Sequence, residues 1–289
     1  MRRFLGINVH RDKRAGTYQL DQSDYIKTVL KNFCMSECKT AATPMGLGAR
    51  FSSSSSEGSP PQKANRNIPY QSAIGSLMYI YQATRPDLAY SISTLSKFNT
   101  SYEEQHWTAV KRVMKYLKGT MNFALTFSKS SNENVIGYCD ASWQPDPHDS
   151  RSISGFIFQL QGGAISWNCK RQSTTALSST EAEYISLTSA TQEAIWLRNF
   201  CVELEIMKDM PTIIYCDNMG ALELAKNAHF TNRTRHIQRR HNFITERIKS
   251  KEIIVHYMST QDMPADILTK STSATKLQDF MKIVGLKDF

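Results

Sequence analysis

The stretch VIGYCD, residues 135–140, is an apolar run of strand length that ends in an aspartate, and TIIYCD, residues 212–217, repeats the pattern. Short apolar runs rich in β-branched and aromatic residues are typical of buried strands. In α/β sheets, reactive groups gather at the carboxyl ends of strands. Two neighbouring strands of this kind would bring Asp140 and Asp217 to one edge of a sheet, so the two stretches predict a fold class and the position of a site.

The segments around these strands predict the rest of one domain over residues 134–272. GFIFQL at 155–160 and AISW at 164–167, with Gly162 and Gly163 between them, predict a hairpin. A long helix from about 180 to 204 follows, with Ser178 or Ser179 as its N-cap. Its inward stripe is Ile185, Ala190, Ala194, Leu197, Cys201 and Leu204.

Four further elements complete this domain. We expect a helix from about 218 to 228, a basic helix over 234–249, a strand over 253–257, and a helix that starts at Pro264. The element order β-β-β-α-β-α-α-β-α predicts a mixed five-stranded sheet with flanking helices, which is an α/β fold.

The residues before 134 predict a smaller part with three regions. Residues 1–45 predict a strand pair and a short helix, and residues 67–130 are mainly helical. Between them, residues 46–66 predict a flexible linker, because this polar stretch cannot bury enough apolar surface to fold by itself. We also expect a C-terminal helix over 273–289.

A helix predicted over 107–117 has apolar residues on one face and a basic opposite face that ends near Gly119. The basic residues are Lys111, Arg112, Lys115 and Lys118. That face is either the solvated side of a core helix or a surface that follows a phosphate backbone.

The composition favours a polyanionic partner. The 289 residues include 35 Lys and Arg against 26 Asp and Glu, a net charge of +9. No apolar run approaches the roughly 20 residues that cross a bilayer, and the first residues lack the apolar core of a secretion signal. We therefore expect an intracellular protein with no membrane partner. The six cysteines lack paired metal-site spacing, which predicts reduced thiols.

Two further acids are expected at the same sheet edge. Glu183 lies near the start of the long helix, and Asp266 near the start of the late helix. Taken singly, such acids commonly cap turns or oppose helix dipoles. Four crowded carboxylates repel one another unless cations neutralise them, and hard divalent ions with oxygen ligands, typically Mg²⁺, suit that position. Two ions about 4 Å apart would stabilise the attacking and leaving oxygens of phosphodiester hydrolysis.

Three motifs around these acids resemble the ribonuclease H domain of copia-type retrotransposon Pol polyproteins. They are YCDASW at 138–143, SSTEAEY at 178–184 and ADILTK at 265–270. Upstream, FLGI at 4–7, residues 22–25, IGSLMY at 74–79 and TRPD at 84–87 resemble the end of the reverse transcriptase in the same family. The resemblance covers nearly the whole chain. It implies a ribonuclease H-like fold preceded by a smaller α+β remnant of the reverse-transcriptase thumb or connection.

The resemblance also implies the active-site set. The catalytic and metal-binding acids are Asp140, Glu183, Asp217 and Asp266, holding two Mg²⁺ ions for which Mn²⁺ can substitute. Glu181 is a rival for the second position, but Ala182-Glu183-Tyr184 fits the family's Ala-Glu-Leu-like context better. His256 lies ten residues before Asp266, the spacing of a mobile family histidine, yet it falls inside a predicted strand. We interpret His256 as structural, with a role in product release as the alternative.

Two groups of residues are candidates for substrate contacts: neighbours of the acids and a cluster of basic residues. By resemblance, Ala141, Ser179, Thr180 and Asn218 are candidates for contacts to the RNA strand. Between His229 and Lys251, seven basic residues face one acid, and this cluster is either a solvated helical face or a rail for phosphates. Its candidate contact residues are Arg233, Arg235, Arg239 and Arg240.

Three functional hypotheses follow. The first is metal-dependent cleavage of the RNA strand of RNA:DNA hybrids within a Pol polyprotein, with the upstream reverse transcriptase as a partner, in cytoplasmic virus-like particles or the nucleus. The second is a catalytically silent or co-opted nucleic-acid-binding remnant. The third is a scaffold that works only within the larger polyprotein. No Asp-Asp pair follows an apolar strand, so we expect no polymerisation by this chain alone.

Overall fold

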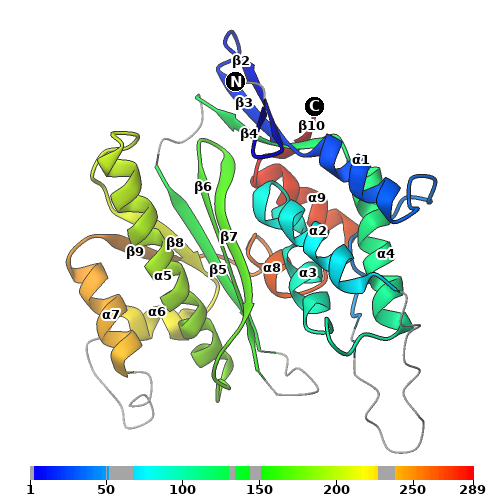
Figure 1. The fold of residues 1–289 in the computed structure, drawn as a ribbon. Coiled ribbons are helices and arrows are strands. Elements are labelled where there is room, and N and C mark those ends of the chain that lie inside the picture. The colour runs from blue at the N-terminus through cyan, green and yellow to red at the C-terminus, as the bar shows by residue number, and fades with distance from the viewer. Residues whose placement is uncertain (1–2, 50, 52–67, 130–133, 144–150, 227–237) are drawn as a thin grey trace, which may run out of the picture. The chain divides into compact units, whose positions relative to one another are not determined.

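The computed structural model describes residues 3–49, 51, 68–129, 134–143, 151–226 and 238–289 (Figure 1). These residues form two compact units. Unit 1 comprises Met1–Ser128 with Ser271–Phe289, and unit 2 comprises Lys129–Lys270. The predicted linker over 46–66 lies largely outside the described residues. No helix in the described ranges combines the length and apolarity needed to cross a bilayer.

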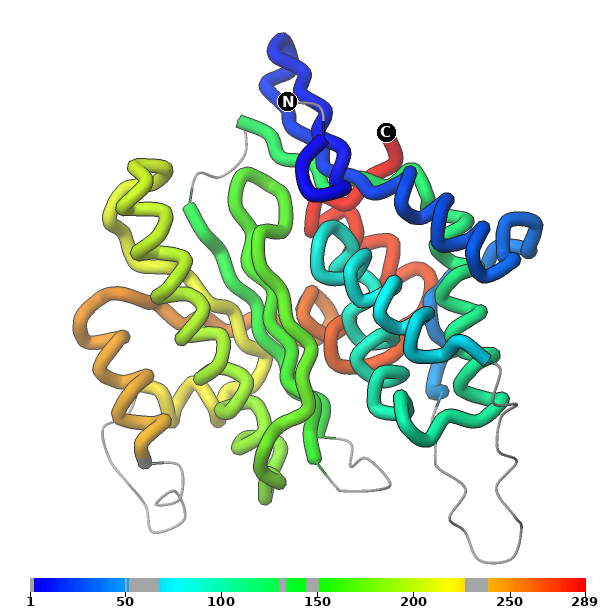
Figure 2. Tube along the Cα trace, in the orientation of Figure 1, coloured from blue at the N-terminus to red at the C-terminus, as the bar shows by residue number. Residues whose placement is uncertain are grey.

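Unit 2 is built on a mixed five-stranded sheet, as the sequence predicted (Figures 1 and 2). The strands, in spatial order, are β7 (Gly163–Arg171), β6 (Ile153–Leu160), β5 (Ile136–Ser142), β8 (Thr212–Cys216) and β9 (Ile253–Tyr257). β5, β6 and β7 pair antiparallel, whereas β8 runs parallel to β5 and β9 parallel to β8. The parallel register places Cys139 opposite Cys216, so the aspartates that follow them lie on neighbouring strands.

Three helices share one apolar core with this sheet. They are α5 (Ser179–Glu203), α6 (Met219–Lys226) and α7 (Gln238–Lys249). The Ser178 hydroxyl accepts a hydrogen bond from the Glu181 N–H (3.1 Å) and so caps α5, as expected. Tyr184, Leu187 and Leu197 pack with strand residues such as Phe158 and Ile214. A fourth, short helix, α8 (Asp266–Thr269), carries the last acid.

Three local expectations about unit 2 need correction. β5 continues two residues beyond Asp140, because Asp140 is paired with Gly155 of β6 and lies inside the strand. Leu204 is 53% exposed, because α5 ends at Glu203 and Leu204 no longer belongs to the helical stripe. Helix α8 begins at Asp266 and not at Pro264. The first residues of the predicted basic helix lie outside the described residues.

Unit 1 contains an antiparallel sheet whose strands come from both ends of the chain. Its order is β1 (Arg3–Phe4), β2 (Ile7–Asp12), β3 (Thr17–Asp21), β4 (Phe123–Ser128) and β10 (Leu286–Asp288). The helices of unit 1 are α1 (Ser23–Asn32), α2 (Tyr70–Ala83), the 3-10 turn η1 (Pro86–Leu88), α3 (Ala89–Ser96), α4 (Glu104–Gly119) and α9 (Ala274–Ile283). The expected helix over 273–289 is therefore wrong at its end, because residues 286–288 pair with β4.

The basic face of α4 is largely engaged within unit 1. The Lys118 ammonium donates to the Cys38 carbonyl (2.9 Å), and the Arg112 guanidinium donates to the Thr43 hydroxyl (2.9 Å). Lys111 lies 3.8 Å from a Glu104 carboxylate oxygen. These contacts favour the structural interpretation of this face over that of a phosphate-binding surface.

Candidate metal centre

The sheet and two helices of unit 2 bring the four predicted acids together. Asp140 lies in β5, Asp217 directly follows β8, Glu183 lies near the start of α5, and Asp266 begins α8. Carboxylate oxygens of Asp140, Asp217 and Asp266 all lie within 4.8 Å of one another. A second group, Glu183, Cys216 and Asp217, meets the same limit. Asp217 belongs to both groups, so the structure gathers all four acids in one cluster.

Hydroxyl groups hold two of these carboxylates. The Thr269 hydroxyl donates to Oδ2 of Asp140, and the Thr260 hydroxyl donates to Oδ2 of Asp217 (2.7 Å). A hydrogen bond to a carboxylate is roughly twice as strong as one between neutral groups. Both side chains are therefore oriented before any ligand arrives.

Glu183 is the most strongly perturbed acid of the cluster. Its side chain is 6% exposed, and Oε2 has no hydrogen-bond partner. The Ala141 N–H donates to the carboxylate, but burial, followed by the nearby Asp140 and Cys216, raises the pKa of Glu183 to about 10. A buried carboxylate in this position needs either a proton or a cation.

Asp140 is perturbed in the same direction. It is 2% exposed, and burial raises its pKa to about 6 although Lys270 opposes the shift. Asp266 and Asp217 add to the upward shift through like-charge repulsion. The cluster thus carries more negative charge than its surroundings neutralise.

Lys270 is a basic neighbour of the acid cluster that the sequence patterns did not single out. Its ammonium lies 2.6 Å from Oδ1 of Asp266, one helical turn earlier. Burial disfavours the ammonium, but Asp140, Asp266 and Asp217 outweigh burial and raise the pKa of Lys270. The i, i+4 spacing of an acid and a lysine was the available signal.

Gly155 lets α8 approach the sheet closely enough to deliver Asp266. A Cβ atom at Gly155 would lie 2.7 Å from Leu268 Cβ and 2.9 Å from Thr269 Cγ2. Real Cβ atoms do not approach neighbours so closely. The absence of a side chain at Gly155 is therefore a condition for the observed position of α8.

The structure separates the two candidate glutamates of α5. Oε2 of Glu181 accepts a hydrogen bond from the Leu177 N–H (2.8 Å), which ties it to the loop before the helix. Glu183 lies within the acid cluster. The geometry favours Glu183 as the ligand.

The predicted substrate contacts fall into two sets. Ser179 and Thr180 lie in the first turn of α5, and Asn218 caps α6 by accepting from the Ala221 N–H (2.9 Å). A Cβ at Gly220 would lie 3.1 Å from Thr180 and 3.2 Å from Asn218 Oδ1, so Thr180 and Asn218 lie close together, and Asn218 directly follows Asp217. In contrast, the Ala141 side chain is 8% exposed and packs in a small apolar cluster.

The predicted basic contacts are only partly described. Arg239 is exposed and Arg240 is half-buried near the start of α7. Arg233 and Arg235 lie outside the described residues. His256 lies in β9, as the sequence indicated, with its ring 6.0 Å from that of Tyr215 and its side chain exposed.

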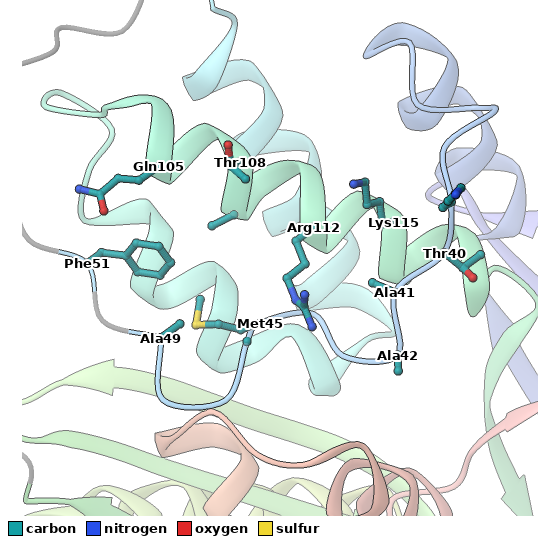
Figure 3. A pocket seen from close by; sticks show the side chains of 13 residues that line it. Thr40, Ala41, Ala42, Met45, Ala49, Phe51, Gln105, Thr108, Arg112 and Lys115 are labelled. Atoms are coloured by element: carbon teal, nitrogen blue, oxygen red, sulfur yellow. The ribbon is translucent and has the colours of Figure 1, made fainter.

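A separate hollow of about 510 Å³ lies in unit 1 (Figure 3). Figure 3 shows Arg112 and Lys115 of α4 on one side, and Met45 and Phe51 from the preceding loop segment on the other. No acid occurs among the described residues that line it. None of the predicted site residues lies there.

Polyproteins of plant transposons are similar to this chain over nearly its whole length. No family model matches the chain. The retrovirus-related Pol polyprotein from transposon TNT 1-94 of Nicotiana tabacum is 37% identical over 284 residues, which are 98% of this chain and 21% of the relative. The corresponding polyprotein from transposon RE2 of Arabidopsis thaliana is 35% identical over 283 residues, 98% of this chain and 19% of the relative. Among solved structures, LC11-RNase H1 in complex with an RNA/DNA hybrid is 14% identical with a TM-score of 0.37, covering 47% of this chain and 94% of that chain.

Three antiparallel strands are followed by two parallel ones, helices lie alongside, and one acid lies within β5 while another directly follows β8. This arrangement gives unit 2 a ribonuclease H-like fold. The chain as a whole belongs to the retrovirus-related Pol polyproteins of copia-type transposons. It spans about a fifth of the length of the curated relatives it matches.

Proposed function

We propose that unit 2 hydrolyses the RNA strand of RNA:DNA hybrids, as the ribonuclease H part of a retrotransposon Pol polyprotein during reverse transcription. The observation that carries this proposal is the acid cluster of Asp140, Glu183, Asp217 and Asp266, in which Oε2 of Glu183 is buried without a hydrogen-bond partner. A cluster of this kind is stable in its charged form only when a cation shares it.

The donor set fits magnesium. Asp140, Asp217 and Asp266 offer carboxylate oxygens within 4.8 Å of one another, and Mg²⁺ prefers oxygen ligands. Mn²⁺ accepts the same ligands. When bound, two such ions would polarise the phosphodiester and stabilise both the attacking and the leaving oxygen.

The chain's own residues prepare the site for these ions. Thr269 and Thr260 fix the carboxylates of Asp140 and Asp217, and the Ala141 N–H fixes that of Glu183. Lys270 places one positive charge beside Asp266. Because the ligands are already oriented, less conformational entropy is lost when the ions bind.

Substrate selection would fall to residues beside the acids and to α7. Thr180 and Asn218 offer polar groups near Asp217, and Ser179 lies in the same helical turn as Thr180. Such groups suit the ribose hydroxyls that line the wide minor groove of a hybrid. Arg239 and Arg240 would contact phosphates at a greater distance. The buried Ala141 would act through Glu183 and not by direct contact.

The direct test uses the purified full chain on labelled RNA:DNA, RNA:RNA and DNA:DNA duplexes of one sequence, with Mg²⁺, Mn²⁺ or a chelator. We expect cleavage of the RNA strand of the hybrid alone, with either metal and not with the chelator. Asp140→Asn should abolish cleavage, whereas Asp279→Asn, at an exposed acid of α9 outside the cluster, should preserve it. Tight hybrid binding without cleavage would contradict the proposal and favour a silent binding module.

A further inference from the structure

A buried thiol lies inside the acid cluster. Cys216 is fully buried at the end of β8, and its Sγ lies within 4.8 Å of a carboxylate oxygen of Glu183 and one of Asp217. The Cys139 residue lies directly across the parallel register from Cys216, and its thiol donates to the Tyr215 carbonyl (3.5 Å). A thiol is not a typical ligand of a magnesium site, because Mg²⁺ binds oxygen ligands.

We propose that Glu183, Cys216 and Asp217 form a binding site for a thiophilic divalent cation such as Zn²⁺ or Cd²⁺, overlapping the proposed magnesium site. The three groups come from three different places in the fold: the start of α5, the last residue of β8 and the residue after it. The sheet and helix therefore preassemble the ligands.

A second observation, besides the position of the thiol, points to a cation here. Oε2 of Glu183 has no hydrogen-bond partner, although the residue is 6% exposed. Unpartnered buried oxygens are costly and usually have a ligand, water or ion nearby. The acid cluster alone would not distinguish hard from soft metals, but the adjacent thiol does.

The dimensions suit a small tetrahedral ion. Zinc lies about 2.3 Å from thiolate sulfur and about 2.0–2.2 Å from carboxylate oxygen, so two such ligands are roughly 3.5 Å apart. The observed donor atoms all lie within 4.8 Å of one another. Their separations need to shorten by only about 1 Å to reach the zinc-bound value, and side-chain rotation can supply this. Binding replaces the S–H bond of Cys216 by a sulfur–metal bond and releases the proton to solvent.

Occupancy by a soft metal would also block magnesium, since Asp217 and Glu183 would serve both ions. This consequence, and only this one, rests on the proposed nuclease function. Thiolate ligands favour zinc and cadmium over magnesium, so a small concentration of soft metal would compete with a large excess of Mg²⁺.

The test is titration of the full chain with Cd²⁺ under a non-chelating reductant, following the ultraviolet charge-transfer band of a cadmium–thiolate bond. We expect a saturable band that Cys216→Ser removes and Cys201→Ser preserves. Cys201 is a matched control, because it is also buried in unit 2 but belongs to neither ligand group.

Glu183→Gln provides a second variant that keeps the thiol. It should weaken Cd²⁺ binding by about tenfold or more, since one charged ligand is lost. A band that persists unchanged in Cys216→Ser, or the absence of any band in the parent chain, would overturn the proposal. This readout needs no catalysis, so it remains decisive if the chain cleaves no hybrid.

Discussion

Replacing Glu183 by glutamine should stabilise the metal-free protein. The pKa of Glu183 is raised from 4.5 to about 10, so at neutral pH the folded chain keeps a proton that the unfolded chain has lost. A folded-state pKa above the unfolded value makes stability fall as pH rises from the lower value toward the higher one. Glutamine does not titrate and escapes that loss.

The size of the effect follows from the window between the two pKa values. Between pH 4.5 and pH 7, each pH unit costs 1.36 kcal/mol, so Glu183 lowers the free energy of unfolding at pH 7 by about 3 kcal/mol. Glu183→Gln should therefore exceed the parent by about that amount at pH 7 and match it near pH 4. The same substitution should abolish hybrid cleavage, so stability and activity would move in opposite directions.

Urea unfolding in the presence of a chelator, monitored by tryptophan fluorescence, measures this difference in the free energy of unfolding for unit 2. Three of the four tryptophans, Trp143, Trp167 and Trp196, lie within the sequence of unit 2. Glu181→Gln is the matched control, because its carboxylate accepts from Leu177 outside the cluster. A Glu183→Gln variant that is no more stable than the parent at pH 7, or whose advantage does not shrink toward pH 4, would refute the reasoning.

Four further outcomes follow from the same geometry. Metal binding needs deprotonated acids, and Asp140 has a pKa of about 6, so Mg²⁺ should raise Tm more at pH 8 than at pH 5. An equal rise in Tm at both pH values, measured by calorimetry, would contradict this. Gly155→Ala, whose Cβ would meet Leu268 at 2.7 Å, should displace α8 and cost about 1–3 kcal/mol in urea unfolding together with most cleavage activity; full activity would show that α8 needs no such close approach. Lys270→Met removes the ammonium beside Asp266, so Tm in chelator should fall and Mg²⁺ should largely restore it; a deficit that persists in saturating Mg²⁺ would assign Lys270 a purely packing role. Replacing both Arg239 and Arg240 by alanine should reduce the slope of log binding constant against log salt by about 2, and an unchanged slope would exclude both as phosphate contacts.

Local sequence patterns predicted most of unit 2. The apolar runs before Asp140 and Asp217 indicated two strands. Gly162 and Gly163 indicated the hairpin, whose turn is formed by Gln161 and Gly162. Ser178 capped α5 as expected, because its hydroxyl satisfies an N–H at the helix start. These features depend on side-chain period and capping chemistry within a few residues, which a sequence displays directly.

Long-range pairings were beyond the same reasoning. β10 pairs with β4, more than 150 residues earlier in the chain. The three residues of β10 contain no pattern that indicates which strand they pair with. The proximity of Cys216 to Glu183 depends on how α5 packs on the sheet. Lys270 was overlooked because an i, i+4 ion pair is common on helix surfaces, and only the fold places this one among the acids.

The central claim is tested most directly by measuring cleavage of a labelled RNA:DNA hybrid in Mg²⁺. Four single variants change the cluster: Asp140→Asn, Glu183→Gln, Asp217→Asn and Asp266→Asn. Glu181→Gln is the control. The acid cluster predicts that each of the four loses cleavage while still binding the hybrid, and that Glu181→Gln retains cleavage. Retained cleavage in any of the four, or loss in Glu181→Gln alone, would contradict the assignment of these acids as the metal ligands.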